Sequence, residues 1–174
     1  LGLELFSLAL YILIATNKSN SKSIEASLKY FILGAISSGV FLFGASLIYG
    51  NSGTINFDEM SFIYLTNYCT NFCIYSQNLV FLTGLILLIT TVMFKLSLVP
   101  FHNWTPDVYE GSPSSITVLL ASSAKFAALI IFLRLVFEPL IIIKEQLQQI
   151  LIVVSILSIL FGNIVALIQN NIKR

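Results

Sequence analysis

Long apolar runs separated by short polar stretches make up most of the chain. A bilayer core about 30 Å thick takes about 20 helical residues at a rise of about 1.5 Å each. Five runs meet this length wholly or nearly, and they predict spans at Leu1–Thr16, Ala26–Tyr49, Leu79–Val99, Ser115–Phe137 and Leu147–Gln169. The linkers between these runs hold the Asn, Pro and charged residues that end helices. The pattern therefore predicts a single all-α membrane domain over residues 1–174, with about five transmembrane helices.

Composition excludes the soluble alternatives. Apolar residues make up 57% of the chain and charged residues only 10%, against about 25% charged residues in an average soluble domain. A mean hydropathy of +0.93 excludes a soluble globule, a disordered tail and a coiled coil, so we expect the chain to contact membrane lipids. The net charge of +1 provides no basic surface for nucleic acid.

The two ends and the two cysteines add smaller expectations. The chain opens at Leu1 inside an apolar run and stops at Arg174 just after another. We therefore expect one piece of a longer polypeptide, or one product of a split gene. Cys69 and Cys73 lack the further His or Cys ligands that a zinc site needs, and a disulfide between them stays open as an alternative.

Basic and small residues predict orientation and packing. The first linker contains Lys18 and Lys22, and the C-terminal tail is also basic, so five spans place both segments on the inner face. On the second span, small residues recur at a spacing of four and predict close helix packing. These pairs are Gly34 with Ser38 and Ala35 with Gly39.

Three ionisable residues lie deep inside apolar runs. Glu4 is about 16 Å from the end of the first run at Ala15, and Lys125 is about 15 Å into the fourth run. Lys95 lies deep in the third run. A charge at mid-bilayer costs about 2.5–3.5 kcal/mol, so such groups usually face the bundle interior and mark an ion or proton route. We predict that these three residues form a proton relay.

Proton exchange is chemically reasonable between a buried carboxyl and a buried amine. Desolvation disfavours the charged form of each, and the opposite charge restores it. The alternative is a static Glu4–Lys95 ion pair that only fixes helix packing. Lys29, near the start of the second span, is a further relay candidate, although its amine could instead extend to the interface. Arg134 lies three residues from the end of its apolar run, so we interpret it as an anchor at the membrane interface.

A proline near the end of the third run predicts an interrupted helix. Pro100 has no N–H, so the carbonyl of Leu96 loses its helical partner one residue after Lys95. Irregular backbone at membrane depth is tolerated where it lines a wet cavity, although an ordinary helix end at the interface remains an alternative. His102, just beyond the break, is a possible accessory relay member because imidazole titrates near neutral pH. Its alternative is a structural role.

The residues around this break resemble a family signature. Residues 94–113 read FKLSLVPFHNWTPDVYEGSP, and they resemble the antiporter-like subunit 2 of NADH:quinone oxidoreductase, respiratory complex I. The segments at 3–5, 25–31, 34–35, 37–39 and 47–50 resemble the same subunit. The likeness extends from the first residues to Arg174 and is weakest between Ile55 and Asn78.

The resemblance implies a larger fold and specific roles. It implies two inverted five-helix repeats, each with an interrupted helix, of which this chain supplies most of the first repeat. Glu4 then matches the fifth-helix glutamate that couples to the seventh-helix lysine, here Lys95. Lys125 matches the eighth-helix lysine, and Lys29 matches a lysine after the fifth helix. The family's twelfth-helix charged residue is absent, so we expect a second chain or segment to complete the subunit.

The resemblance also implies the activity and the partners. The chain would be a proton-translocating subunit of NADH:ubiquinone reductase, assembled with other membrane-arm subunits. The sequence contains no glycine-rich phosphate loop and no cysteine set. We therefore expect NADH, FMN, iron–sulfur clusters and ubiquinone to be bound by other subunits, and no cofactor or metal in this chain. The alternatives are a cation/proton antiporter subunit and a structural membrane-arm scaffold without its own proton path.

Composition gives one expectation about location. The Ile- and Asn-rich sequence resembles the product of an AT-rich organellar gene, which favours the mitochondrial inner membrane. A plastid thylakoid and a bacterial inner membrane are the alternatives.

Overall fold

The described part of the chain is entirely helical. The computed structural model describes residues 2–16, 20–60, 62, 75–138 and 144–169, and no strand occurs in these ranges. The main elements are α1 (Gly2–Ile14), α2 (Ser21–Ser52), α4 (Tyr75–Leu96), α5 (Trp104–Gly111), α6 (Ser114–Ala121), α7 (Ser123–Phe137) and α8 (Lys144–Ile168). The predicted all-α membrane fold is confirmed.

Most of the predicted spans correspond to long apolar helices. Four segments of the described chain are long and apolar enough to cross a membrane, namely Ser21–Ser52, Leu79–Leu96, Ser114–Phe137 and Leu147–Ile168. The first run forms α1, whose 13 residues cover about 20 Å and fall short of a full crossing. Cys69, Cys73 and three of the basic residues used for orientation, Lys18, Lys173 and Arg174, lie outside the described residues.

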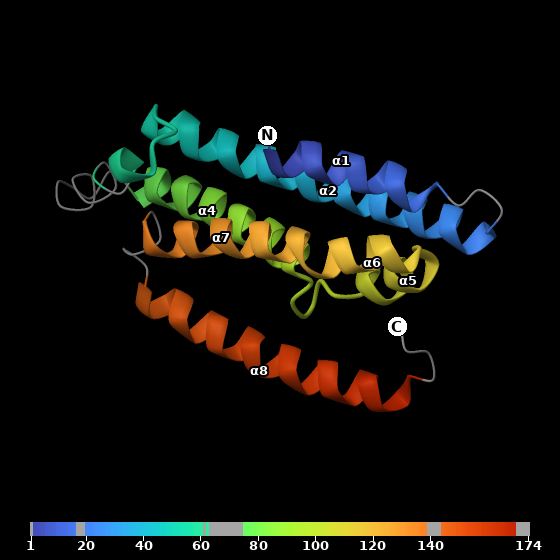
Figure 1. Cartoon of the computed structure of the whole chain (residues 1–174). Coiled ribbons are helices and arrows are strands. Elements are labelled where there is room, and N and C mark those ends of the chain that lie inside the picture. Colours follow the sequence, from blue (N-terminus) through green and yellow to red (C-terminus); the bar gives the residue numbers. More distant parts are fainter. Residues whose placement is uncertain (1, 17–19, 61, 63–74, 139–143, 170–174) are drawn as a thin grey trace.

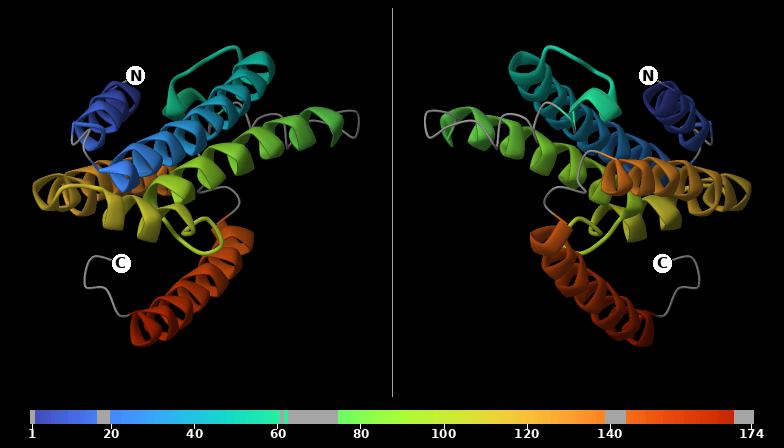
Figure 2. Two further views of the ribbon diagram at one scale, coloured as in Figure 1. Left: turned by 90° about the vertical axis from the view of Figure 1, so that its right-hand side faces the viewer. Right: turned by 90° about the vertical axis from the view of Figure 1, so that its left-hand side faces the viewer.

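Successive long helices run in alternating directions. In Figure 1, α2, α4, the α6–α7 pair and α8 pass back and forth between the two ends of the bundle. The start of α2 and the end of α8 lie at the same end, as the four successive passes require. Helix α2 packs against α1, α4 and α5. Figure 2 shows α8 set to one side of the other helices.

Helix caps explain why α2 is longer than the apolar run that predicted it. The Asn20 side chain accepts the N–H of Lys22 at 3.1 Å, so the helix begins ahead of Ala26. At the other end, Gly53 adopts a left-handed conformation with φ 69°, and its N–H donates to the Tyr49 carbonyl at 2.8 Å. The polar residues at both ends therefore belong to the helix.

Two clusters of buried side chains hold the helices together. The larger cluster joins α2, α4, α7 and the start of α8, with Leu85, Leu135 and Leu147 among its members. The second joins α1, α2, α5 and α6 around Tyr30 and Trp104. The linker predicted at 100–113 thus contains a helix, α5, which contributes Trp104 and Val108 to this second cluster.

The closest approach of α2 and α4 depends on two glycines. A Cβ atom on Gly44 would lie 2.9 Å from the carbonyl oxygen of Gly84, and a Cβ on Gly84 would lie 2.9 Å from that of Gly44. The two pairs of small residues that the sequence predicts to allow close packing, Gly34 with Ser38 and Ala35 with Gly39, differ in their surroundings. Gly34 is packed under the Tyr11 hydroxyl, but no described atom would lie within 4 Å of a Cβ on Gly39. The prediction of close packing by Ala35 and Gly39 is therefore wrong for the described helices, because that face of α2 is exposed.

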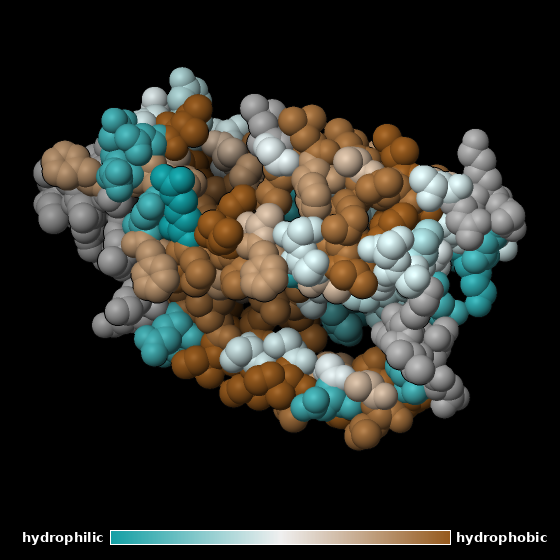
Figure 3. Space-filling view, viewed as in Figure 1, coloured by the Kyte–Doolittle hydropathy of each residue, from teal (hydrophilic) through white to brown (hydrophobic). Residues whose placement is uncertain are grey.

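Apolar side chains cover much of the outer surface. Figure 3 shows them along most of the visible face. Large exposed hydrophobic residues occur on every long helix, and on α8 they lie on nearly all sides. This surface suits a hydrocarbon environment, in which no water penalises exposed Leu, Ile and Phe.

The glycine contact makes a stability prediction. We expect Gly44→Ala to lower the free energy of unfolding of the membrane domain by about 1–3 kcal/mol, because the added methyl must push α4 away. The matched control is Gly39→Ala on the same helix, which adds the same methyl in open space. Thermal unfolding in detergent checks both. Equal melting temperatures for the two variants would contradict the assigned crossing point.

Candidate functional site

Glu4 collects hydrogen-bond donors from three helices. Its Oε1 atom accepts the ammonium of Lys95 on α4, and its Oε2 atom accepts the Ser38 hydroxyl of α2 at 2.5 Å. On α1 itself, the Ser7 hydroxyl donates to the Glu4 backbone carbonyl at 2.8 Å. The predicted meeting of Glu4 and Lys95 is therefore present as a salt bridge, with 37% and 17% of their side chains exposed.

The salt bridge lies near the middle of the bundle. Ser38 is 17 residues from the start of α2 at Ser21, which is about 25 Å along a helix of 32 residues. Lys95 stands in the last turn of α4, where the helix dipole favours a positive charge. Helix α4 therefore stops well short of the N-terminal end of α2, and α5 covers that remaining N-terminal part of α2.

The predicted interruption is present, and α4 ends at Leu96, earlier than the predicted Val99. Ser97 adopts a left-handed conformation with φ 55°. Its N–H donates to the Phe94 carbonyl, and the Leu98 N–H donates to the Met93 carbonyl, both at 3.0 Å. This is a Schellman cap, in which Ser97 occupies the position that usually holds Gly. The cap ends the helix before Pro100 is reached.

Two carbonyl groups at the end of α4 are satisfied by side chains. The Leu96 carbonyl, which the sequence predicts to lose its helical partner, accepts the Ser97 hydroxyl at 2.6 Å. The Lys95 carbonyl accepts the ammonium of Lys125 at 3.3 Å, and the same ammonium donates to the Ser97 hydroxyl. Lys125 is therefore held by the open end of a helix, whose carbonyl dipoles favour a cation.

Trp104 completes the surroundings of Lys125. The ammonium lies 5.1 Å from the centre of the Trp104 ring, within the range of a cation–π interaction. The indole N–H donates to the Phe94 carbonyl at 3.2 Å and fixes the ring against α4. The carbonyl, hydroxyl and ring that contact the Lys125 ammonium are thus uncharged, whereas Lys95 pairs with a carboxylate.

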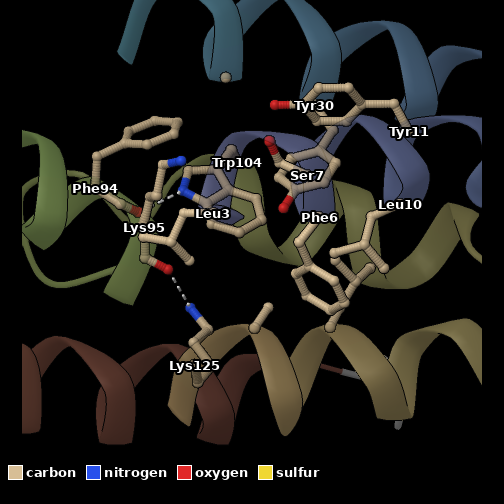
Figure 4. Close-up of a pocket in the computed structure, with 13 residues that line it drawn as sticks. Leu3, Phe6, Ser7, Leu10, Tyr11, Tyr30, Phe94, Lys95, Trp104 and Lys125 are labelled. Atoms are coloured by element: carbon tan, nitrogen blue, oxygen red, sulfur yellow. Dashed lines mark hydrogen bonds between the residues drawn. The ribbon is translucent and has the colours of Figure 1, made fainter. Parts of the chain in front are cut away.

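A small cavity connects these groups. It measures about 30 Å³ and has Lys95 on one side and Lys125 on the other. Figure 4 shows both lysines approaching this space, with Trp104 between them. A buried water needs about 10–15 Å³ of such volume, so the cavity has room for about two. Apolar and aromatic side chains form most of the remaining wall, including Phe6, Leu10 and Tyr30. We call this space the inner cavity.

Lys29 lies in a different place from the other three predicted relay residues. Its ammonium forms salt bridges with Glu25 at 2.8 Å and with Asp107 of α5 at 3.0 Å, and 44% of its side chain is exposed. Nearby, Lys22 pairs with Glu110 at 3.0 Å. These residues line a polar hollow of about 340 Å³, which we call the outer hollow. Burial raises the pKa of the adjacent Tyr109 phenol, which therefore stays neutral.

His102 and Arg134 stand apart from the inner cavity. The His102 ring lies 6.1 Å from the ring of Phe161 on α8, and its buried Nδ1 atom has no hydrogen-bond partner among the described residues. Its relay role stays a prediction. Arg134 pairs with Glu138 at 3.1 Å and lies over the Phe57 ring, near the end of α7, as an anchoring residue would.

Sequence reasoning missed several residues of the site. It assigned no role to Ser97 or Trp104, although both lie within the quoted motif, and it considered Ser38 only as a packing residue. It also missed a break at Ser122, which separates α6 from α7 three residues before Lys125. The signal was a pair of serines inside an apolar run. The Ser122 and Ser123 hydroxyls donate to carbonyls four residues earlier, a pattern that bends helices.

A protein-family model matches the chain over its full length. Residues 1–174 match the transmembrane family described as NADH:quinone oxidoreductase/Mrp antiporter. The chain belongs to this family. Membership agrees with the resemblance found in residues 94–113.

Curated relatives narrow the likeness within the family. Over 174 residues the chain is 48% identical to NADH-quinone oxidoreductase subunit N of Beijerinckia indica and 45% identical to that of Rhodospirillum rubrum. The subunit N of Pelagibacter ubique is also 45% identical. The match covers all of this chain but only 34–35% of each relative. The chain therefore spans about a third of the length of the relatives it matches.

Solved structures share the same helix arrangement. A chain of the archaeal membrane-bound sulfane sulfur reductase superposes with a TM-score of 0.78 at 31% identity, over 98% of this chain and 33% of that one. A chain of respiratory complex I from Thermus thermophilus gives 0.75 at 36% identity, over 98% and 34%. A chain of the Mrp complex from Dietzia gives 0.66 at 20% identity, over 79% and 24%, which shows the fold alone.

The cap at the end of α4 makes a prediction about Ser97. We expect Ser97→Val to be less stable than Ser97→Gly by about 1–3 kcal/mol, because both variants lose the hydroxyl but only Gly adopts φ 55° without strain. Thermal unfolding of both variants checks this expectation. Similar melting temperatures for the two would show that the left-handed conformation does not end the helix.

Proposed function

We propose that this chain is part of the antiporter-like subunit N, or subunit 2, of an NADH:quinone oxidoreductase, and that it relays protons in the membrane arm. The proposal rests on one observation above the others. Lys95 and Lys125, from two different helices, line a single small cavity, and Glu4 from a third helix pairs with Lys95. Family membership and the relatives named subunit N support the assignment to this enzyme complex.

The first step would occur at the Glu4–Lys95 pair. The carboxylate stabilises the ammonium form of Lys95 through Coulomb attraction, which is strong where water is scarce. A movement of α1 relative to α4 would separate the two groups, and Lys95 would then lose this stabilisation. Redox energy released in other subunits would drive the separation. Lys95 would then release its proton into the inner cavity.

Lys125 is suited to the second step. Its ammonium is held by a carbonyl, a hydroxyl and an aromatic ring rather than by a carboxylate. Those partners remain in place when the amine is neutral, so the side chain can exchange a proton without breaking an ion pair. Water in the inner cavity would connect it with Lys95. Helices beyond this chain would continue the route, because the family's twelfth-helix charged residue is not among its residues.

The surroundings of the site imply partners and a location. Other membrane-arm subunits, a second chain or segment that completes the subunit, and lipids would cover the exposed apolar faces of α2 and α8. NADH, FMN, iron–sulfur clusters and ubiquinone would be bound elsewhere in the complex. We place the chain in the mitochondrial inner membrane on composition. The named relatives are bacterial, so fractionation of the source cell decides between an organellar and a bacterial membrane.

We predict that Lys125→Ala preserves assembly of the complex and lowers the number of protons pumped per NADH by at least about half. The charge lost lies on the relay itself, whereas Arg134→Ala removes a charge at the end of the same helix and serves as the matched control. Proton uptake by proteoliposomes, measured together with NADH oxidation, gives the ratio. An unchanged ratio for Lys125→Ala would falsify the relay. Loss of the assembled complex would indicate a scaffold instead.

We predict that Glu4→Gln lowers turnover several-fold, because Lys95 keeps a hydrogen-bond partner but loses its counter-charge. Glu138→Gln, which changes a partly exposed carboxylate just after α7, should be silent. The measurement is NADH:quinone reductase activity in native membranes. Normal activity of Glu4→Gln would favour the static ion pair. Sodium- or potassium-dependent transport in the absence of any redox partner would instead indicate a cation/proton antiporter.

A further inference from the structure

The inner cavity and the outer hollow lie on opposite sides of one thin wall. Among the described residues, the two spaces have no lining residue in common. Helix α2 borders both, since Ala26 lines the outer hollow and Tyr30 lines the inner cavity. These two residues are four apart, so the wall along α2 is a single helical turn, or about 6 Å.

Helix α5 has the same arrangement. Trp104 lines the inner cavity, whereas Asp107 and Glu110 line the outer hollow. Val108 stands one turn after Trp104 and is 0% exposed. Both helices therefore present an aromatic ring to the inner cavity and polar or small residues to the outer hollow. On each helix the change occurs within about one turn.

The wall itself consists of closely packed, mostly apolar side chains. The rings of Tyr30 and Trp104 are stacked, with centroids 5.0 Å apart and planes inclined by 20°. Ala26, which is 2% exposed, and Val108 pack behind them in the same buried cluster. Two more tyrosines, Tyr11 and Tyr109, pack against this cluster, and the buried Ser23 and Ser27 hydroxyls near Ala26 donate to backbone carbonyls. The Ala26 and Val108 side chains carry no polar atom. A proton needs water or a polar group at each step, so these two side chains obstruct its passage.

The outer hollow is large and lined by charged residues, unlike the inner cavity and the wall between them. It is about ten times larger than the inner cavity, at about 340 Å³ against 30 Å³. Two lysines and three carboxylates line it; two of their ion pairs join α2 to α5, and the third lies within α2. A space of this size with charged walls holds water. It therefore brings the aqueous phase to within one helical turn of the inner cavity.

These observations point to a gated mouth. We infer that the outer hollow is the aqueous mouth through which protons reach Lys125 and Lys95, and that Tyr30, Trp104, Ala26 and Val108 form the barrier that separates the mouth from the relay. The inference rests on the proposed function. It adds the route by which the relay exchanges protons with one side of the membrane. It also gives Lys29 a place at the mouth rather than in the relay.

A hydroxyl placed in the barrier tests the inference. Val108→Thr keeps the shape of the side chain and adds one polar atom between the two spaces. The matched control is Val118→Thr on α6, where the side chain is 65% exposed on the outer surface. The intact complex is reconstituted into vesicles, a pH gradient is imposed without NADH, and its decay is followed with an entrapped dye. We expect at least about twofold faster decay for Val108→Thr and wild-type decay for Val118→Thr.

A second pair of variants protects the test against a folding defect. Ala26→Ser adds a hydroxyl to the barrier from α2, and Ala35→Ser adds one on the exposed face of the same helix. Only the first should speed the decay. Adding Lys125→Ala to Val108→Thr should restore slow decay, because the leak must pass the relay. Slow decay in both barrier variants, or a leak that persists without Lys125, overturns the inference.

The outcomes separate the inference from the proposed function. If Lys125→Ala lowers the protons pumped per NADH but neither barrier variant leaks, the relay stands and the mouth lies elsewhere. If the barrier variants leak and Lys125→Ala pumps normally, the route exists and the relay assignment fails.

Discussion

The open end of α4 is the constraint on which the rest of the site depends. A helix that stops in the middle of a membrane leaves carbonyl groups that neither lipid nor water can satisfy. Here the Leu96 and Lys95 carbonyls are satisfied by Ser97 and by the ammonium of Lys125. The same feature that would be costly in hydrocarbon thus becomes a binding place for a buried cation. The lysine and the broken helix each reduce the cost of the other.

The two lysines differ in the kind of partner that stabilises their charge. Lys95 faces a carboxylate, so its charge depends on whether α1 remains close. Lys125 faces dipoles and a ring, and these partners do not depend on a counter-charge. A route for protons benefits from such a difference, because a movement at one pair changes one amine and leaves the other as a receiver. Trp104 serves both parts, since it contacts Lys125 and holds the end of α4 through Phe94.

Much of this could be predicted from the sequence, for identifiable reasons. The apolar runs predict the helices because the bilayer fixes their length, and the depth of Glu4 and Lys95 predicts their pairing because lone charges are too costly there. The position of Lys29 was harder to predict, since Asp107 and Glu110 belonged to a segment expected to be a linker and instead lie on α5. The packing by Gly44 and Gly84 was also missed. These are single small residues, and only the crossing of two helices brings them together.

The contact between Gly44 and Gly84 has a mechanical consequence. Two backbones that touch without intervening side chains can tilt about their contact, so the contact acts as a fulcrum. Lys95 is 11 residues beyond Gly84, a lever arm of about 16 Å. A tilt of about 10° around that point would displace the amine by about 3 Å, roughly the length of one hydrogen bond. Small rotations of α4 are therefore enough to make or break the pair with Glu4.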